Sequence, residues 1–156
     1  MVNSRRMIQF GFTNETKIEV DEQEFPQILE RAYALLKDDI DKKLLGRNGV
    51  LDLILVSDST MRGLNKEYRD KDKTTDVIAF AYLEVTEYEK QKGDIIVGDI
   101  FISVDTAKKQ AKKKKHNLTK ELNVLFAHGL LHVFGYDHKS KKQEKEMEEM
   151  AKKILS

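Results

Sequence analysis

The sequence predicts an α/β (α+β) protein in which a small, mixed, four-stranded sheet is covered by about five helices. Apolar runs short enough for strands alternate with longer segments whose apolar residues recur at three- and four-residue steps, as on one face of a helix. The chain has 156 residues, the length of one ordinary domain, and this is enough to bury a real core. We therefore expect residues 1–156 to form a single domain.

The first half of the chain is expected to contain two strands and two helices. These are a strand over Arg6–Phe12, a helix from about Asp21 to Leu45, a strand over Val50–Val56 and a short helix that follows it. The long helix follows from one apolar face between Phe25 and Ile40 and from Gly46 at its end. The second strand is a dense aliphatic run, typical of a buried strand. Asp58 and Ser59 are the candidate N-caps of the short helix.

The second half is expected to contain two more strands and three more helices. The strands are Val77–Val85 and Ile95–Val104, separated by a polar turn or loop from Glu84 to Gly93, and the helices are Asp105–His116, Leu118–Phe134 and Lys139–Leu155. Asp105 is the candidate cap of the first of these helices. Gly135 is the expected C-terminal stop of the second.

The composition excludes several classes of protein. Lysine and arginine total 28 and aspartate and glutamate total 27, so the net charge of +1 points to no class of partner. The absence of cysteine rules out a disulfide scaffold, a cysteine-ligated zinc site, an iron–sulfur cluster and a thiol nucleophile. No apolar run approaches the ~20 residues of a membrane span, and the start MVNSRRMIQF lacks the apolar core of a signal peptide. We expect a cytoplasmic protein with no membrane partner.

Three of the four histidines, His128, His132 and His138, fall within eleven residues. His128 and His132 are four residues apart on a predicted helix, so both project from one face about one turn apart. Gly135 then ends that helix and lets the chain reverse, which can bring His138 back toward the same point. Three protein ligands with an open fourth position are typical of a catalytic zinc site, where the bound water ionises near pH ~7. The sequence therefore predicts one zinc ion per chain.

The spacing H-x3-H-x5-H leaves other interpretations open. Metzincin-type metalloproteases share it, but they carry a glutamate general base directly after the first histidine, where this chain has Gly129. A glycine inside a helix costs about 1 kcal/mol against alanine, so we expect close approach of a substrate or another backbone there. A purely structural zinc would need a fourth ligand, for which Asp137 is the nearest candidate, or Asp137 could orient a ligating imidazole. The simplest alternative is a cluster of histidines without a metal.

The stretch HGLLHVFGYDH, from His128 to His138, resembles the signature of the YbeY family of bacterial rRNA-maturation endoribonucleases. LNKEYRDKDKTTDVIAF (64–80) is similar to the second block of that family, and GDIFIS (98–103) to its third. The blocks occur in the same order as in the family. Two departures are conservative: Thr74 stands where the family often has proline, and Ala79 where a small hydroxyl residue is common.

The resemblance implies a metalloprotease-like α/β fold with one zinc ion held by the three histidines. It implies hydrolysis of single-stranded RNA, maturation of the 3′ end of small-subunit rRNA and a part in ribosome quality control. The implied partners are this RNA, the small ribosomal subunit and its assembly factors, and DNA is not expected. Without the glutamate, the general base stays open, and either zinc-bound hydroxide or the ribose 2′-OH could attack. A metalloprotease and a non-catalytic ribosome-binding module with structural zinc are the alternatives.

The matched blocks contain further candidate site residues. The resemblance assigns a function in the cleft to Arg69, whose guanidinium could contact the scissile phosphate with two hydrogen bonds. Asp76, Asp99 and Asn65 are expected to support a loop or a ligand rather than to catalyse. Between residues 105 and 120 there are seven lysines and one acid. The candidate RNA-binding residues among them are Lys112, Lys113, Lys114 and Lys115, and a solvated helix face is the alternative.

Overall fold

The computed structural model describes residues 8–83 and 92–156. Within these residues it has four strands and five helices: β1 (Ile8–Asn14), α1 (Phe25–Leu44), β2 (Gly49–Val56), α2 (Asp58–Arg69), β3 (Val77–Ala81), β4 (Ile95–Ser103), α3 (Val104–Lys114), α4 (Leu118–Val133) and α5 (Lys141–Leu155). The predicted fold class is confirmed, with the ends of most elements shifted by a few residues. Residues 6, 7, 84 and 85 of the predicted strands, and the predicted loop up to residue 91, lie outside the described residues.

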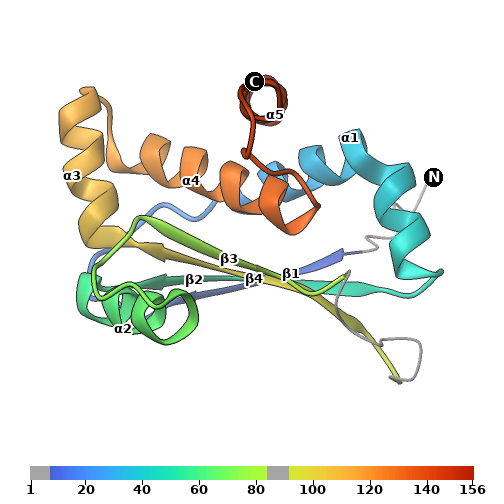
Figure 1. Ribbon diagram of the computed structural model, residues 1–156, viewed down its shortest axis with the longest axis horizontal. Coiled ribbons are helices and arrows are strands. Elements are labelled where there is room, and N and C mark those ends of the chain that lie inside the picture. The colour runs from blue at the N-terminus through green and yellow to red at the C-terminus, as the bar shows by residue number, and fades with distance from the viewer. Residues whose placement is uncertain (1–7, 84–91) are drawn as a thin grey trace.

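The sheet is mixed, with the strand order β1-β2-β4-β3. β2 pairs in parallel with β1 and β4, whereas β3 is antiparallel to β4. Figure 1 shows α1, α4 and α5 over one face of the sheet, α2 against the other face, and α3 rising at one end. None of the helices in the two described ranges has the length and apolar character of a membrane span. β3 is an edge strand, so one of its sides is not covered by a neighbouring strand.

α4 is the central helix of the layer that covers the sheet. It packs against α1, α3 and α5 and against the strands β3 and β4. Its apolar residues are not confined to one stripe, which is the pattern of a buried helix. Those buried in the core are Leu122, Leu125, Phe126, Ala127, Leu130, Leu131 and Val133. The helix that carries His128 and His132 is therefore held on several sides by the core.

Gly129 allows α4 to lie close to β4. A Cβ atom placed on Gly129 would lie 2.8 Å from the Cγ2 atom of Ile100, which is closer than real side chains approach. The nearest neighbour of Gly129 is thus the side chain of Ile100 in the sheet. The expected approach of a substrate or another backbone at Gly129 is wrong, because this side of the helix faces β4.

Serine residues, and not the predicted acids, cap two of the helices. The Ser57 hydroxyl accepts a hydrogen bond from the Thr60 N–H at the start of α2 (3.2 Å), and the Ser103 hydroxyl accepts one from the Thr106 N–H at the start of α3 (3.3 Å). The predictions of Asp58, Ser59 and Asp105 as caps are therefore wrong. Each serine has the extended backbone that an N-cap needs, whereas the two aspartates lie in the first helical turn.

Asp58 joins α2 to α3 and to the loop before β3. Its Oδ1 atom accepts hydrogen bonds from the hydroxyls of Ser103 (2.5 Å), Thr106 (2.6 Å) and Thr74 (3.2 Å). Lys109 Nζ lies 3.5 Å from its other carboxylate oxygen. Burial acts to raise the pKa of Asp58, but these donors together outweigh it, and the net effect lowers the pKa from its usual 3.8. Thr74, which precedes β3, thus contributes one of these bonds.

Asp58→Ala is expected to lower the free energy of unfolding at neutral pH by about 1–3 kcal/mol, because the buried hydroxyl of Ser103 loses its acceptor. A carboxyl group whose pKa is lowered by folding stabilises the protein above its unfolded pKa, near 3.8, and this contribution is lost as the pH falls through the folded pKa. The difference in the free energy of unfolding between wild type and variant should therefore become smaller below about pH 4. Urea unfolding at about pH 7 and pH 3 measures it. Asp38→Ala, which removes an exposed carboxylate of α1, is the control, and a difference independent of pH would contradict this account.

Candidate active site

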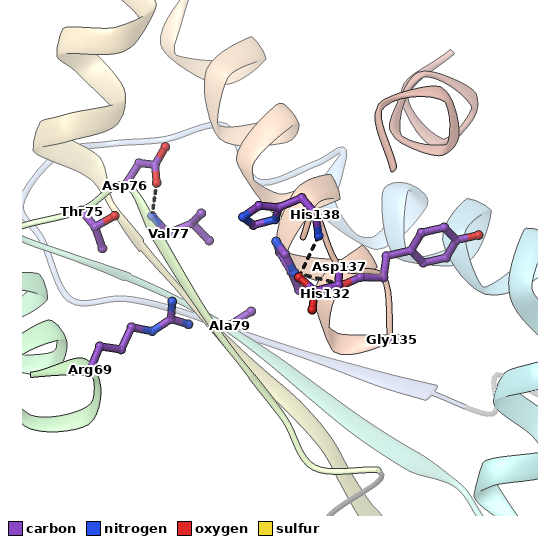
Figure 2. A pocket seen from close by; sticks show the side chains of 10 residues that line it. Arg69, Thr75, Asp76, Val77, Ala79, His132, Gly135, Asp137 and His138 are labelled. Carbon is purple, nitrogen blue, oxygen red and sulfur yellow. Dashed lines mark hydrogen bonds between the residues drawn. The ribbon is translucent and has the colours of Figure 1, made fainter. Parts of the chain in front are cut away.

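A cavity of about 610 Å³ opens between β3, the end of α2 and the turn after α4 (Figure 2). The residues that line it are Arg69, Thr75, Asp76, Val77, Ala79, His132, Gly135, Tyr136, Asp137 and His138. The antiparallel pairing of β3 with β4 places β3 beside α4, and this contact joins segments that are distant in the sequence. The cavity therefore contains residues from the first and the second of the three blocks singled out in the sequence.

The turn after α4 is sharp because Gly135 adopts a left-handed conformation with a φ of 102°. The Gly135 N–H donates to the His132 carbonyl (3.1 Å), and the Tyr136 N–H donates to the Leu131 carbonyl (2.9 Å). The chain reverses here, and the ring centres of His132 and His138 lie 5.1 Å apart. Gly135 thus ends the helix as expected, and His138 returns to the side of His132.

His132 is oriented by a backbone carbonyl. Its Nδ1 atom lies 3.2 Å from the Tyr136 carbonyl oxygen, so Nδ1 carries the ring proton and the Nε2 lone pair is left for a ligand. Burial lowers the pKa of His132, and the neighbouring His138 lowers it further, against the opposing effects of the Tyr136 bond and Asp137. His132 is therefore neutral at pH 7, which is the form that binds a metal ion.

His128 lies one helical turn before His132 on the same face of α4 and is half-buried. Burial is also the largest effect on the pKa of His128, which it lowers, while the charge of Asp76 acts in the opposite direction. His128 is not among the residues that line the cavity. Within residues 8–83 and 92–156, no three His, Cys, Asp or Glu side chains lie close enough together to hold a metal ion as they stand. The structure thus brings His132 and His138 together and leaves His128 a turn away.

Imidazole groups are common zinc ligands, and the distance between the rings of His132 and His138 fits a shared zinc ion. Two imidazoles on a tetrahedral zinc ion have their ring centres about 5 Å apart, because each Zn–N bond is about 2.0–2.1 Å long. The ring centres of His132 and His138 match this at 5.1 Å. His128 adds a neutral imidazole at the helical spacing that zinc sites use.

Arg69 faces the histidines from the other side of the cavity. It is the last residue of α2, and Figure 2 shows its side chain extending from that helix toward the open space. Among the described residues Arg69 has no hydrogen-bond or ion-pair partner. A guanidinium group presents its donors in a planar fork that matches the oxygens of a phosphate or carboxylate. This wall of the cavity can therefore bind an anion.

Asn65 and Asp76 hold the loop that runs from α2 to β3. Asn65 is 3% exposed, and its side-chain amide donates to the Lys73 carbonyl (2.8 Å). Asp76 lines the cavity, and its carboxylate accepts from the Val77 N–H (2.7 Å) and from the Gln110 amide (3.2 Å). Both side chains act on the backbone or on a neighbouring helix, so they shape the wall that carries Arg69 and Thr75.

The other predicted residues lie around the cavity or outside it. The Asp137 carboxylate accepts a hydrogen bond from the backbone N–H of His138 (2.7 Å), so it supports the turn and not an imidazole ring. Asp99 does not line the cavity and accepts a hydrogen bond from the Tyr82 hydroxyl (3.2 Å). Residues 112–115 are exposed around the C-terminal end of α3 and lie outside the cavity as well.

Three residues contribute to the site in ways that the sequence does not predict. Tyr136 acts through its carbonyl group, and a backbone atom leaves no trace in residue identity. Gln110 reaches Asp76 from α3, a contact that depends on how the helix packs. Thr75 lines the cavity directly before Asp76, and this adjacency within the second block is the one signal that could have identified it.

The fold and the cavity define a class of protein: a small α/β protein with a histidine-bearing helix and an arginine across a cleft. A sequence model of the family described as endoribonuclease YbeY matches residues 11–156. An endoribonuclease YbeY from Mycoplasmopsis synoviae is 36% identical over 156 residues, which cover 100% of this chain and 95% of that protein. An endoribonuclease YbeY from Bacillus licheniformis is 44% identical over 110 residues, 68% of this chain and 70% of that protein. The chain belongs to the endoribonuclease YbeY family, and the predicted family and enzyme class are thereby confirmed.

A solved structure is also similar. The solution structure of a Thermotoga maritima protein aligns with a TM-score of 0.51 at 24% sequence identity, covering 94% of this chain and 89% of that one. At this identity the likeness concerns the fold alone. It agrees with the mixed sheet and the helices described above.

Proposed function

We propose that this chain is a single-strand-specific, zinc-dependent endoribonuclease that acts in maturation of the small-subunit rRNA 3′ end and in ribosome quality control. One observation carries the proposal: in a chain of this family, Arg69, which has no partner among the described residues, faces His132 and His138 across one cavity. Its partners are then single-stranded RNA, the small ribosomal subunit and assembly factors, with no membrane and no DNA. Residues 1–156 act as one cytoplasmic, metal-dependent hydrolase domain.

His128, His132 and His138 would hold one zinc ion per chain. Bound there, zinc would supply a water molecule of lowered pKa and polarise a phosphoryl oxygen of the substrate. Arg69 binds the scissile phosphate from the opposite wall and offsets the negative charge that develops on it during cleavage. The Tyr136 carbonyl keeps the Nε2 atom of His132 turned to the ligand. Water and the ribose 2′-OH are the two possible nucleophiles, and a 2′,3′-cyclic phosphate on the product identifies the second.

The lysines around the end of α3 are proposed to bind RNA phosphates outside the cavity. The cluster consists of Lys112, Lys113, Lys114 and Lys115. Lys114 is committed to the buried carboxylate of Glu121 (3.1 Å), whereas the other three have no ion-pair partner in the described parts of the chain. The hydrogen bond from Gln110 to Asp76 connects α3 to the cavity wall, so RNA that leaves the cavity on this side meets the lysines.

A metalloprotease is a second candidate because its histidine spacing is the same. The structure argues against it at Gly129, where the protease glutamate would stand. A side chain there would meet Ile100 of β4, so a glutamate at this position would require the helix or the strand to shift. This geometry favours RNA over peptide hydrolysis in this chain.

The first test combines metal content with substrate choice. The protein, without a His-tag, is analysed for zinc and incubated with a single-stranded RNA carrying the rRNA 3′ end, with its duplex and with casein. We expect about one zinc per chain, chelator-sensitive cleavage of the single strand alone and intact casein. Bound zinc without RNA cleavage would favour the binding module with structural zinc, and digestion of casein would favour the metalloprotease.

The proposed RNA contact of the lysines has its own test. The triple variant K112Q/K113Q/K115Q should reduce the slope of log Kd against log salt by about 2, at ~0.7 per phosphate contact.

A further inference from the structure

Tyr68 is an exposed aromatic residue next in sequence to Arg69, which lines the cavity. It precedes Arg69 at the end of α2, and 58% of its surface is accessible. Every other aromatic residue among the described ones is buried or half-buried. Aromatic side chains normally bury much of their large apolar area, so an exposed ring next to a functional cavity needs a reason beyond core packing.

The Tyr68 ring is held in a fixed place. It packs edge-to-face on Phe80 with the ring centres 5.2 Å apart and the planes at 75°. Phe80 packs in the same way on Phe101, at 5.9 Å and 88°. Phe80 belongs to β3 and Phe101 to β4, so this row of rings anchors Tyr68 to the sheet. A ring that is already ordered loses little conformational freedom when a ligand stacks on it.

The ring also lies where a strand of RNA would continue beyond Arg69. Tyr68 and Arg69 are consecutive on a helix, so their side chains leave the same helix end in different directions. Phe80, on which Tyr68 rests, follows Ala79 of the cavity wall along the edge strand β3. Successive side chains of a strand point to opposite faces of the sheet. RNA that crosses the edge of β3 at Arg69 therefore passes from the histidines to Tyr68.

We propose that Tyr68 is a stacking platform for one unpaired base next to the phosphate that Arg69 binds. The platform takes any of the four bases, because each has an aromatic face. In a duplex the faces of a base are covered by its neighbours, so Tyr68 selects single-stranded RNA. This inference rests on the proposed function and adds a base subsite to it. The competing role for Tyr68 is only to shield Phe80 from water.

The test measures binding to the full-length, metal-loaded protein by rapid mixing, so that binding is recorded before cleavage interferes. Tyr68→Ala and Tyr68→Leu are expected to weaken binding of a single-stranded oligonucleotide about 5- to 150-fold, the range of one stacked base. Leucine still covers Phe80, so a loss in this variant separates stacking from shielding. Tyr68→Phe should recover most of that loss, because stacking uses the ring and not the hydroxyl. Leu35→Ala removes another exposed apolar side chain, on α1, and serves as the control.

An abasic sugar, moved along the oligonucleotide, locates the stacked base. At one position it should make wild type and Tyr68→Leu bind equally well, since the base that stacks is missing. Equal binding of intact RNA by the leucine and phenylalanine variants would overturn the inference, as would a loss that no abasic position removes. If the wild type neither binds nor cleaves single-stranded RNA, the proposed function fails and the inference with it. If the wild type cleaves such RNA and Tyr68→Ala and Tyr68→Leu bind it as tightly as the wild type does, only the inference fails.

Discussion

Replacing His132 by alanine is expected to remove the bound zinc and to slow cleavage of single-stranded RNA by about 10³-fold or more. His132 has the most complete surroundings of the three histidines: His138 lies beside it with the ring centres 5.1 Å apart, and the Tyr136 carbonyl fixes its ring. Removing it would take one ligand away from the proposed zinc site and leave the other two without their neighbour. Metal polarisation of a phosphoryl oxygen stabilises the transition state by several kcal/mol, and every ~1.4 kcal/mol lost is a factor of ten in rate.

The matched control for this variant is His116→Gln. His116 is the remaining histidine of the chain, and its Nε2 atom lies 2.7 Å from the buried carboxylate of Glu121. Glutamine keeps a donor for that carboxylate, so the variant should retain its fold, its zinc and its cleavage. Zinc analysis, circular dichroism and single-turnover cleavage are measured for both variants. An active, zinc-loaded His132→Ala protein would show that the metal site has been assigned to the wrong residues.

The elements with the strongest apolar pattern are the ones that the sequence predicts best. β2 was expected over Val50–Val56 and runs over Gly49–Val56, and α4 was expected over Leu118–Phe134 and ends at Val133. Both elements are buried in the core, and burial of their apolar residues is what stabilises them there. The apolar pattern of the sequence therefore predicts their positions well. The start of α1 differs by four residues, from Asp21 to Phe25. The intervening residues are polar and carry no periodicity, and the better signal is Pro26, which suits the first turn of a helix.

Some features of the candidate site follow from local sequence, whereas others depend on how distant elements pack together. His128 and His132 follow from helical spacing, and the return of His138 follows from the glycine that ends the helix. The role of Arg69 came from the family resemblance, because an arginine at a helix end is usually only solvated. The support of His132 by a carbonyl and of Asp76 by Gln110 depends on packing between elements. No local pattern in a single sequence encodes such contacts.

Arg69→Ala is expected to lower kcat/KM for single-stranded RNA about 10²- to 10³-fold, the usual cost of removing one group that stabilises transition-state charge. The zinc content should stay unchanged, because Arg69 stands across the cavity from the histidines. Arg69→Lys should recover only part of the activity, since an ammonium group restores the charge but not the planar fork of donors. If Arg69 acts mainly on the transition state, the loss appears in kcat, whereas uniform binding of the phosphate would appear in KM.

Arg62→Ala is the matched control, because it removes the same charge from the same helix outside the cavity. Arg62 pairs with Asp72 at 2.8 Å on the surface, and such exposed pairs contribute little to stability. Its variant should therefore cleave RNA within about twofold of wild type and differ little in stability. Equal losses in the two variants would mean that the net charge of α2 attracts RNA and that Arg69 makes no special contact. If only the net charge matters, high salt should abolish the loss of cleavage in both variants. If Arg69 binds a phosphate in the cavity, the loss in Arg69→Ala should persist at high salt.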